Sequence, residues 1–286
     1  MSIETVRLVV QAATLLSLVW AAGGALYILT LGGRSRAADG LARTWVLSAG
    51  LVGLLATLSG AVLQLLEIGG DWAAALDPFT IELFAETGGV SSALRLAGCA
   101  ILILWILFRG GPLIALAGVI AVIASFAFSG HVVSHEPGWL LRLAVAAHVI
   151  AAAFWVGSLM PLRAAILRDP PDSAANLMDA FAARATGGLV LLVATGGALA
   201  GLLSGAWPWL WAETDWGRGL LLKLCLVAVL LGFAALHRLV MTHNLRLDRP
   251  GARRTFAASI AAEMAVAALI VVATVSFASR FSPTSE

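Results

Sequence analysis

The segment LLRLAVAAHVIAAAFWVGSLMP, residues Leu140–Pro161, decides the fold class, because it is an apolar run long enough to cross a bilayer as a helix. Apolar runs of about 18 to 23 residues recur along the 286-residue chain. The chain is 60% hydrophobic and only 12% charged, whereas a soluble domain carries about a quarter charged residues. The sequence therefore predicts an all-α, polytopic membrane protein. We expect eight spans, at Val6–Leu31, Thr44–Leu66, Ser91–Phe108, Pro112–Gly130, Leu140–Pro161, Thr186–Ser204, Gly219–Met241 and Phe256–Ser279.

The loops differ in charge on the two sides of the expected bundle. Arginine is concentrated in the loops that join spans one to two, three to four, five to six and seven to eight. By the positive-inside rule these loops lie in the cytoplasm, so both termini are periplasmic. The opposite loops hold acidic residues and six tryptophans, which predicts an aromatic belt with short interfacial helices on the outer side. The tryptophans are Trp72, Trp139, Trp207, Trp209, Trp211 and Trp216.

Two pairs of similar segments occur in the same order in the two halves of the chain. GLVGLLATLSGA from Gly50 resembles GLVLLVATGGAL from Gly188, and LFAETGG from Leu83 resembles LWAETDW from Leu210. We therefore expect one integral membrane domain, residues 1–286, built as a parallel repeat of four spans each, with halves at about 1–132 and 139–286.

The repeat makes Arg95 and Lys223 equivalent positions near the outer surface. Each side chain is either an interfacial anchor that reaches the headgroups or a partner for the acidic outer loops or an anion.

Three of the five histidines lie close together, which is unusual in a chain with so little charge. His131 and His135 stand four apart, the spacing that lets two imidazoles on one helix face share an ion, and Glu136 follows at the rim. His148 lies roughly 12 Å along the fifth span, where an imidazole without a partner leaves polar nitrogens in hydrocarbon. This pattern predicts an outward-opening metal site. Nitrogen ligands with little carboxylate suit copper first, ahead of zinc, nickel or iron.

The remaining polar residues inside the spans have less specific interpretations. Trp155 falls on the same helical stripe as His148. Glu263 is the one acid clearly within a span, and we expect it to pair with Arg253 or Arg254 or to form an inner polar station.

His237 and His243 are expected to be ordinary interfacial residues at the inner end of the seventh span. Cys99 and Cys225 fall inside spans and are expected to be apolar fillers, with a thiolate contribution to a soft metal left open.

Four short motifs resemble those of the copper resistance protein D family of bacterial inner-membrane proteins. These are SGH at Ser129–His131, a histidine followed by AAAFWVGSLMPL at Ala151–Leu162, ETDWGRGLLLKL at Glu213–Leu224, and the Ala262–Glu263 pair. The resemblance implies a role in moving or handling copper at the inner membrane, commonly with a periplasmic copper carrier protein.

Residue by residue, the resemblance gives His131 and His148 the family's histidine positions, Trp155 and Gly157 its Trp-Gly pair, and Lys223 its lysine. The chain departs from the family pattern at Val145 (an acid in many members), Ser158 (glycine), Trp216 (tyrosine) and His237 (asparagine). Without the acid, the tautomer of His148 must be set by another span.

The sequence thus predicts a copper-handling inner-membrane protein that imports or translocates copper from the periplasm. His131, helped by His135, would capture the ion, and His148 would draw it inward between helices four and five. No enzyme activity is expected, and no Walker motif is present for ATP-driven pumping.

Two alternatives stay open. One is a b-type haem or quinol redox protein ligated by His148 with His131 or His237. The other is a non-transporting copper-binding assembly or sensing subunit.

Overall fold

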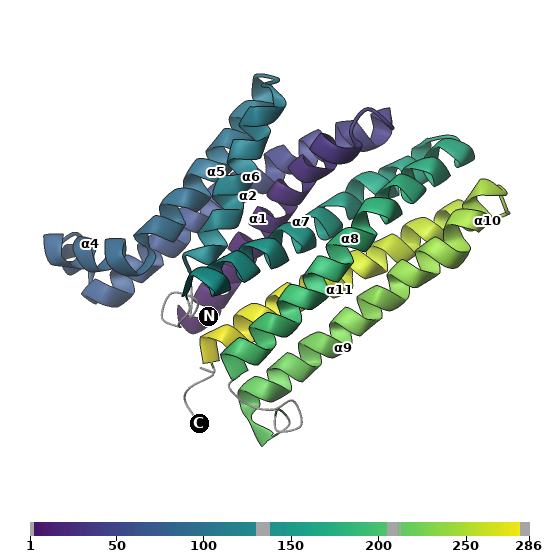
Figure 1. The fold of residues 1–286 in the computed structure, drawn as a ribbon. Coiled ribbons are helices and arrows are strands. Elements are labelled where there is room, and N and C mark those ends of the chain that lie inside the picture. The colour runs from purple at the N-terminus through teal and green to yellow at the C-terminus, as the bar shows by residue number, and fades with distance from the viewer. Residues whose placement is uncertain (1–2, 130–137, 205–210, 212, 281–286) are drawn as a thin grey trace.

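The computed structural model describes residues 3–129, 138–204, 211 and 213–280, which fold as helices joined by short connections (Figure 1). The α-helices are α1 (Ile3–Leu31), α2 (Arg36–Gly69), α3 (Trp72–Ala75), α4 (Pro78–Phe84), α5 (Val90–Leu107), α6 (Pro112–Ala127), α7 (Gly138–Arg168), α8 (Pro171–Ser204), α9 (Asp215–Leu236), α10 (Thr242–Arg246) and α11 (Ala252–Arg280). Two π-helical turns, η1 (Ala85–Gly89) and η4 (His237–Met241), continue α4 into α5 and α9 into α10.

Seven helices in the described part of the chain are long and apolar enough to span a membrane. They confirm an all-α, polytopic membrane protein. The expected fourth span corresponds to α6, which has only 16 residues and is shorter than the usual length of a span. The count of eight spans and the outer position of both termini therefore stay predictions.

Local sequence signals set several helix ends. Ser35 begins α2, since its hydroxyl accepts a hydrogen bond from the Ala38 amide at 3.0 Å. Gly70 ends α2 with a φ of 84°, a left-handed conformation that costs glycine little. Thr214 begins α9 in the same way as Ser35, accepting from the Gly217 amide at 3.0 Å. The short helix α3 fits the interfacial helices expected between spans two and three.

The helices form two groups that follow chain order (Figure 1). The first group, α1, α2, α5 and α6, surrounds an apolar core that includes Leu18, Leu102 and Val119. The second group is α7 to α11, and its core around Leu162 and Phe256 also includes Tyr27 and Leu31 of α1. The expected halves of the chain and their origin as a repeat stay predictions.

Glycines join the two groups where α1 crosses α7. A Cβ on Gly23 would collide with the Ala153 carbonyl, and a Cβ on Gly157 would collide with the backbone of Gly23. The two helix backbones therefore approach as closely as those of small-residue interfaces in membranes. This crossing fixes the depth at which α7 presents its polar side chains.

Candidate functional site

Two of the three histidines expected in one site, His131 and His135, lie outside the described residues, as does Glu136. The shared site for three imidazoles therefore stays a prediction. The structure does place Ser129, two positions before His131, and His148.

His148 lies half-buried on α7 and faces α8. Its Nδ1 atom is 3.2 Å from the Thr195 hydroxyl, and that hydroxyl donates its single proton to the Leu191 carbonyl at 2.6 Å. The Thr195 oxygen must then accept from Nδ1, so Nε2 keeps the lone pair that binds a metal. Gly196 leaves room for the ring, since a Cβ there would lie 3.2 Å from Cε1 of His148.

The partner that fixes the His148 tautomer comes from the sixth expected span, consistent with the prediction that another span must supply it. The sequence had placed the site between helices four and five, whereas the described contacts of His148 lie on α8.

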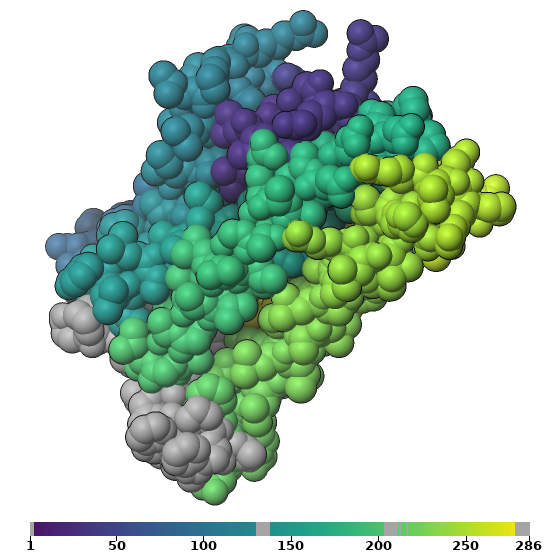
Figure 2. Space-filling view, turned by 45° about the vertical axis from the view of Figure 1, so that its right-hand side comes forward, coloured from purple at the N-terminus to yellow at the C-terminus, as the bar shows by residue number. Residues whose placement is uncertain are grey.

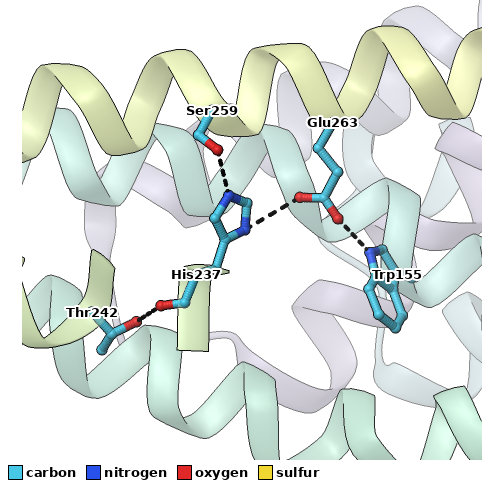
Figure 3. Close-up of polar contacts among 5 residues, drawn as sticks. All are labelled: Trp155, His237, Thr242, Ser259 and Glu263. Carbon is cyan, nitrogen blue, oxygen red and sulfur yellow. Dashed lines mark hydrogen bonds and ion pairs between the residues drawn. The ribbon is translucent and has the colours of Figure 1, made fainter. Parts of the chain in front are cut away.

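A second polar cluster lies deeper in the same helix group, between α7, η4 and α11 (Figure 3). Glu263 is only 1% exposed, and its Oε1 accepts a hydrogen bond of 2.8 Å from Nε1 of Trp155. His237, 6% exposed, places Nδ1 3.4 Å from Glu263 Oε2 and Nε2 2.9 Å from the Ser259 hydroxyl. Trp155 and His237 thus stand on either side of one buried carboxylate.

This cluster overturns one sequence expectation and fits one of the two alternatives left open for Glu263, the inner polar station. The prediction that His237 is interfacial is wrong, because the helix does not end there but continues through η4 and α10 to Arg246. Glu263 has Trp155 and His237 as its described partners, whereas Arg253 donates to the backbone carbonyls of Ile166 and Asp169 at the end of α7.

A cavity of about 320 Å³, the Glu263 cavity, adjoins this cluster. Its wall is mainly apolar, and its lining residues include Trp155, Met178, His237 and Glu263, with Asp179, Thr186, Arg238 and Thr242 as further polar residues. Most of its lining comes from α7, α8, α9 and α11, and the space-filling view shows the surface hollowed between α8 and α9 (Figure 2).

A larger cavity of about 480 Å³, the Arg95 cavity, lies near the start of α1, lined mainly by the first helix group and also by Thr274 and Val275 of α11. It is more polar than the Glu263 cavity, and an Arg7–Glu67 ion pair of 3.3 Å lies on its wall. Arg95 and Ser129 line it as well. Lys223, the expected equivalent of Arg95, is half-buried on α9 in the second group, so the structure does not bring the two cations into one site.

Among the described residues, no three His, Cys, Asp or Glu side chains converge as a metal site. Cys99 is buried and Cys225 exposed, and both are free thiols. A copper site built from the described residues would therefore use at most two such ligands, with a thioether, a backbone group or water completing the coordination.

Comparison with known families now decides the identity. Residues 2–141 match the family described as copper resistance protein D-like, N-terminal domain, and residues 175–277 match copper resistance protein D. The chain belongs to the copper resistance protein D family. This confirms the resemblance seen in the motifs and identifies a multi-pass inner-membrane protein. No curated protein and no solved structure is significantly similar to the chain.

The two matched regions bear differently on the two polar clusters. His237 and Glu263 fall inside the region matched to copper resistance protein D, whereas His148 and Trp155 lie between the two matches. The motifs had indicated Trp155 and Glu263 separately, and no sequence signal indicated that they touch.

Proposed function

We propose that this protein translocates copper from the periplasm across the inner membrane. The observation that carries the proposal is the family itself, since both matched regions belong to copper resistance protein D. His131 and His135 would capture the ion at the outer mouth, with Glu136 at the rim, and His148 would receive it within the membrane. A periplasmic copper carrier would deliver the ion.

The arrangement of α7 supports a path along its contact with α8. His148 meets Thr195, and the Trp155 ring packs edge-on against Phe181 with ring centroids 6.5 Å apart. Because Trp155 follows His148 by two helical turns, both side chains lie on one face of α7, about 10 Å apart along its axis. A copper ion that leaves His148 along this face of α7 would next meet Trp155 and the Glu263 cavity.

The polar Arg95 cavity supports an entrance on the side of the termini. Its wall includes Ser129, and the chain reaches His131 two positions later. We propose no enzymatic step, and movement would follow the copper gradient or be coupled to another ion.

The central experiment replaces His148 with alanine and measures copper in cells by mass spectrometry. We expect His148→Ala to abolish protein-dependent copper accumulation while the amount of protein in the membrane stays the same. His243→Ala is the matched control, since His243 is an exposed histidine outside both clusters. Unchanged accumulation in His148→Ala would contradict the proposed path.

Two measurements on purified protein separate the alternatives. Copper that binds but does not cross proteoliposome membranes would favour the assembly or sensing role. A Soret band in the absorption spectrum would favour a bis-histidine haem protein.

A further inference from the structure

Two facing atoms in the second cluster have the geometry of metal ligands. Nδ1 of His237 lies 3.4 Å from Oε2 of Glu263, and Oε2 is buried with no hydrogen-bond partner. Two ligands bound at about 2.0 to 2.1 Å in a tetrahedral arrangement stand about 3.4 Å apart. The gap therefore matches the space that an ion shared by these two atoms requires.

We propose that His237 and Glu263 form an inner Cu(I) site on the wall of the Glu263 cavity. The proposal rests on the proposed function for the identity of the ion, since copper reaches this depth only if the protein moves it. The site would be the station after His148 on the path.

The cluster orients both ligands for this task. The Trp155 indole holds Oε1 of Glu263, which turns Oε2 toward His237. The Ser259 hydroxyl bonds Nε2 of His237, which turns Nδ1 toward Glu263 (Figure 3). Metal-binding imidazoles and carboxylates are held in this way, each by a second hydrogen bond on the atom that does not bind the metal.

Charge favours a monovalent ion. Glu263 is the buried acid of the cavity wall. Arg238 lines the same cavity and donates to the neutral Thr186 hydroxyl at 2.9 Å, so its positive charge remains and disfavours a divalent ion further, whereas Arg253 donates to backbone carbonyls of the α7 end. The other acid of the cavity wall, Asp179, is already paired with Arg246 at 2.6 Å. A carboxylate with a neutral imidazole carries one negative charge, which Cu(I) neutralises completely in a low-dielectric setting.

The local backbone also serves the site. His237 is the first residue of the π-helical turn η4, and the Thr242 hydroxyl donates to its carbonyl at 2.9 Å. A π-turn shifts the phase of the helix and recurs at functional sites. Here it turns the ring of His237 toward α11. The adjoining cavity leaves the remaining coordination positions open, with the Met178 thioether on its wall.

The test measures equilibrium Cu(I) binding to purified full-length protein, under anaerobic conditions and against a chromogenic Cu(I) chelator. The starting variant carries His131→Ala, His135→Ala and His148→Ala, so that the outer histidines contribute nothing. We expect this variant to retain one bound Cu(I) per chain. Adding Glu263→Gln or His237→Gln should remove that ion, whereas adding His243→Ala should not.

Two further readouts keep the result interpretable. The first readout is X-ray absorption of the copper-loaded variant that lacks the outer histidines and also carries His243→Ala. It should show one imidazole ligand to copper. Glu263 and His237 are intact in this variant, so the result does not depend on how their own variants fold. Absence of an imidazole ligand, or full Cu(I) binding in both Glu263→Gln and His237→Gln, would overturn the inner site. Failure of the proposed transport function would show instead as normal accumulation by His148→Ala, with inner binding unaffected.

Discussion

Trp155 donates a 2.8 Å hydrogen bond to Glu263 across 108 positions of sequence, which ties α7 to α11 through one buried carboxylate. Neither side chain is more than 8% exposed. A carboxylate at this depth is costly unless its oxygens are held, and the indole holds one of them. The other oxygen is left facing His237.

We expect Trp155→Phe to weaken Cu(I) binding at the His237–Glu263 pair by about 10- to 100-fold, the usual effect of losing an orienting hydrogen bond. Chelator competition on the variant that lacks the outer histidines measures this. Stability should fall by about 1–3 kcal/mol in thermal unfolding, since Oε1 loses its donor in a buried site. Trp139→Phe is the control, because Trp139 is 66% exposed. Equal Cu(I) affinities in the two variants would show that the indole does not orient Glu263.

We expect Gly157→Ala to disrupt the crossing of α1 and α7, since a Cβ at this position would collide with the backbone of Gly23. Overpacking of this kind costs about 1–3 kcal/mol, measured as a lower unfolding temperature. Gly187→Ala is the matched control, because no atom lies within 4 Å of the position its Cβ would take. If Gly157→Ala were as stable as Gly187→Ala, the Trp-Gly motif would need an explanation other than helix packing.

The helical, membrane-spanning fold was predictable because length and hydrophobicity alone set it. The expected span Leu140–Pro161 lies inside α7, and Phe256–Ser279 lies inside α11. The ends were less predictable: α8 begins at Pro171, well before the expected Thr186, because its first turns pack into the core through Ala174, Ala175 and Leu177.

The inner cluster was not predictable, for two physical reasons. A contact between Trp155 and Glu263 depends on how helices far apart in sequence rotate and pack, which periodicity does not determine. The π-turn at His237–Met241 also breaks the 3.6-residue period, so a regular helix misplaces His237 relative to the rest of α9. His148 is half-buried and its partner Thr195 lies on another helix, in line with the partner that the sequence required, while its role with copper stays a prediction.

We expect Thr195→Val to lower protein-dependent copper accumulation, because Nδ1 of His148 loses the acceptor that fixes its tautomer. The substitution keeps the side-chain shape, so the amount of protein in the membrane should not change. Thr44→Val is the control, since the Thr44 hydroxyl bonds only the Gly40 carbonyl of its own helix among its described contacts. Wild-type accumulation by Thr195→Val would show that this hydroxyl does not prepare His148 for copper.

Met178 is 5% exposed, and it lines the Glu263 cavity, as the proposed Cu(I) ligands do. We expect Met178→Leu to weaken Cu(I) binding at the inner site while leaving Zn(II) binding unchanged, because a thioether favours Cu(I) and contributes little to zinc. The substitution nearly preserves volume, so packing should lose less than about 1.5 kcal/mol. Met160→Leu, on α7 away from the lining of the cavity, is the control. An equal loss of Cu(I) and Zn(II) affinity would mean that Met178 supports the site by packing alone, and no loss of either would place it outside the coordination sphere.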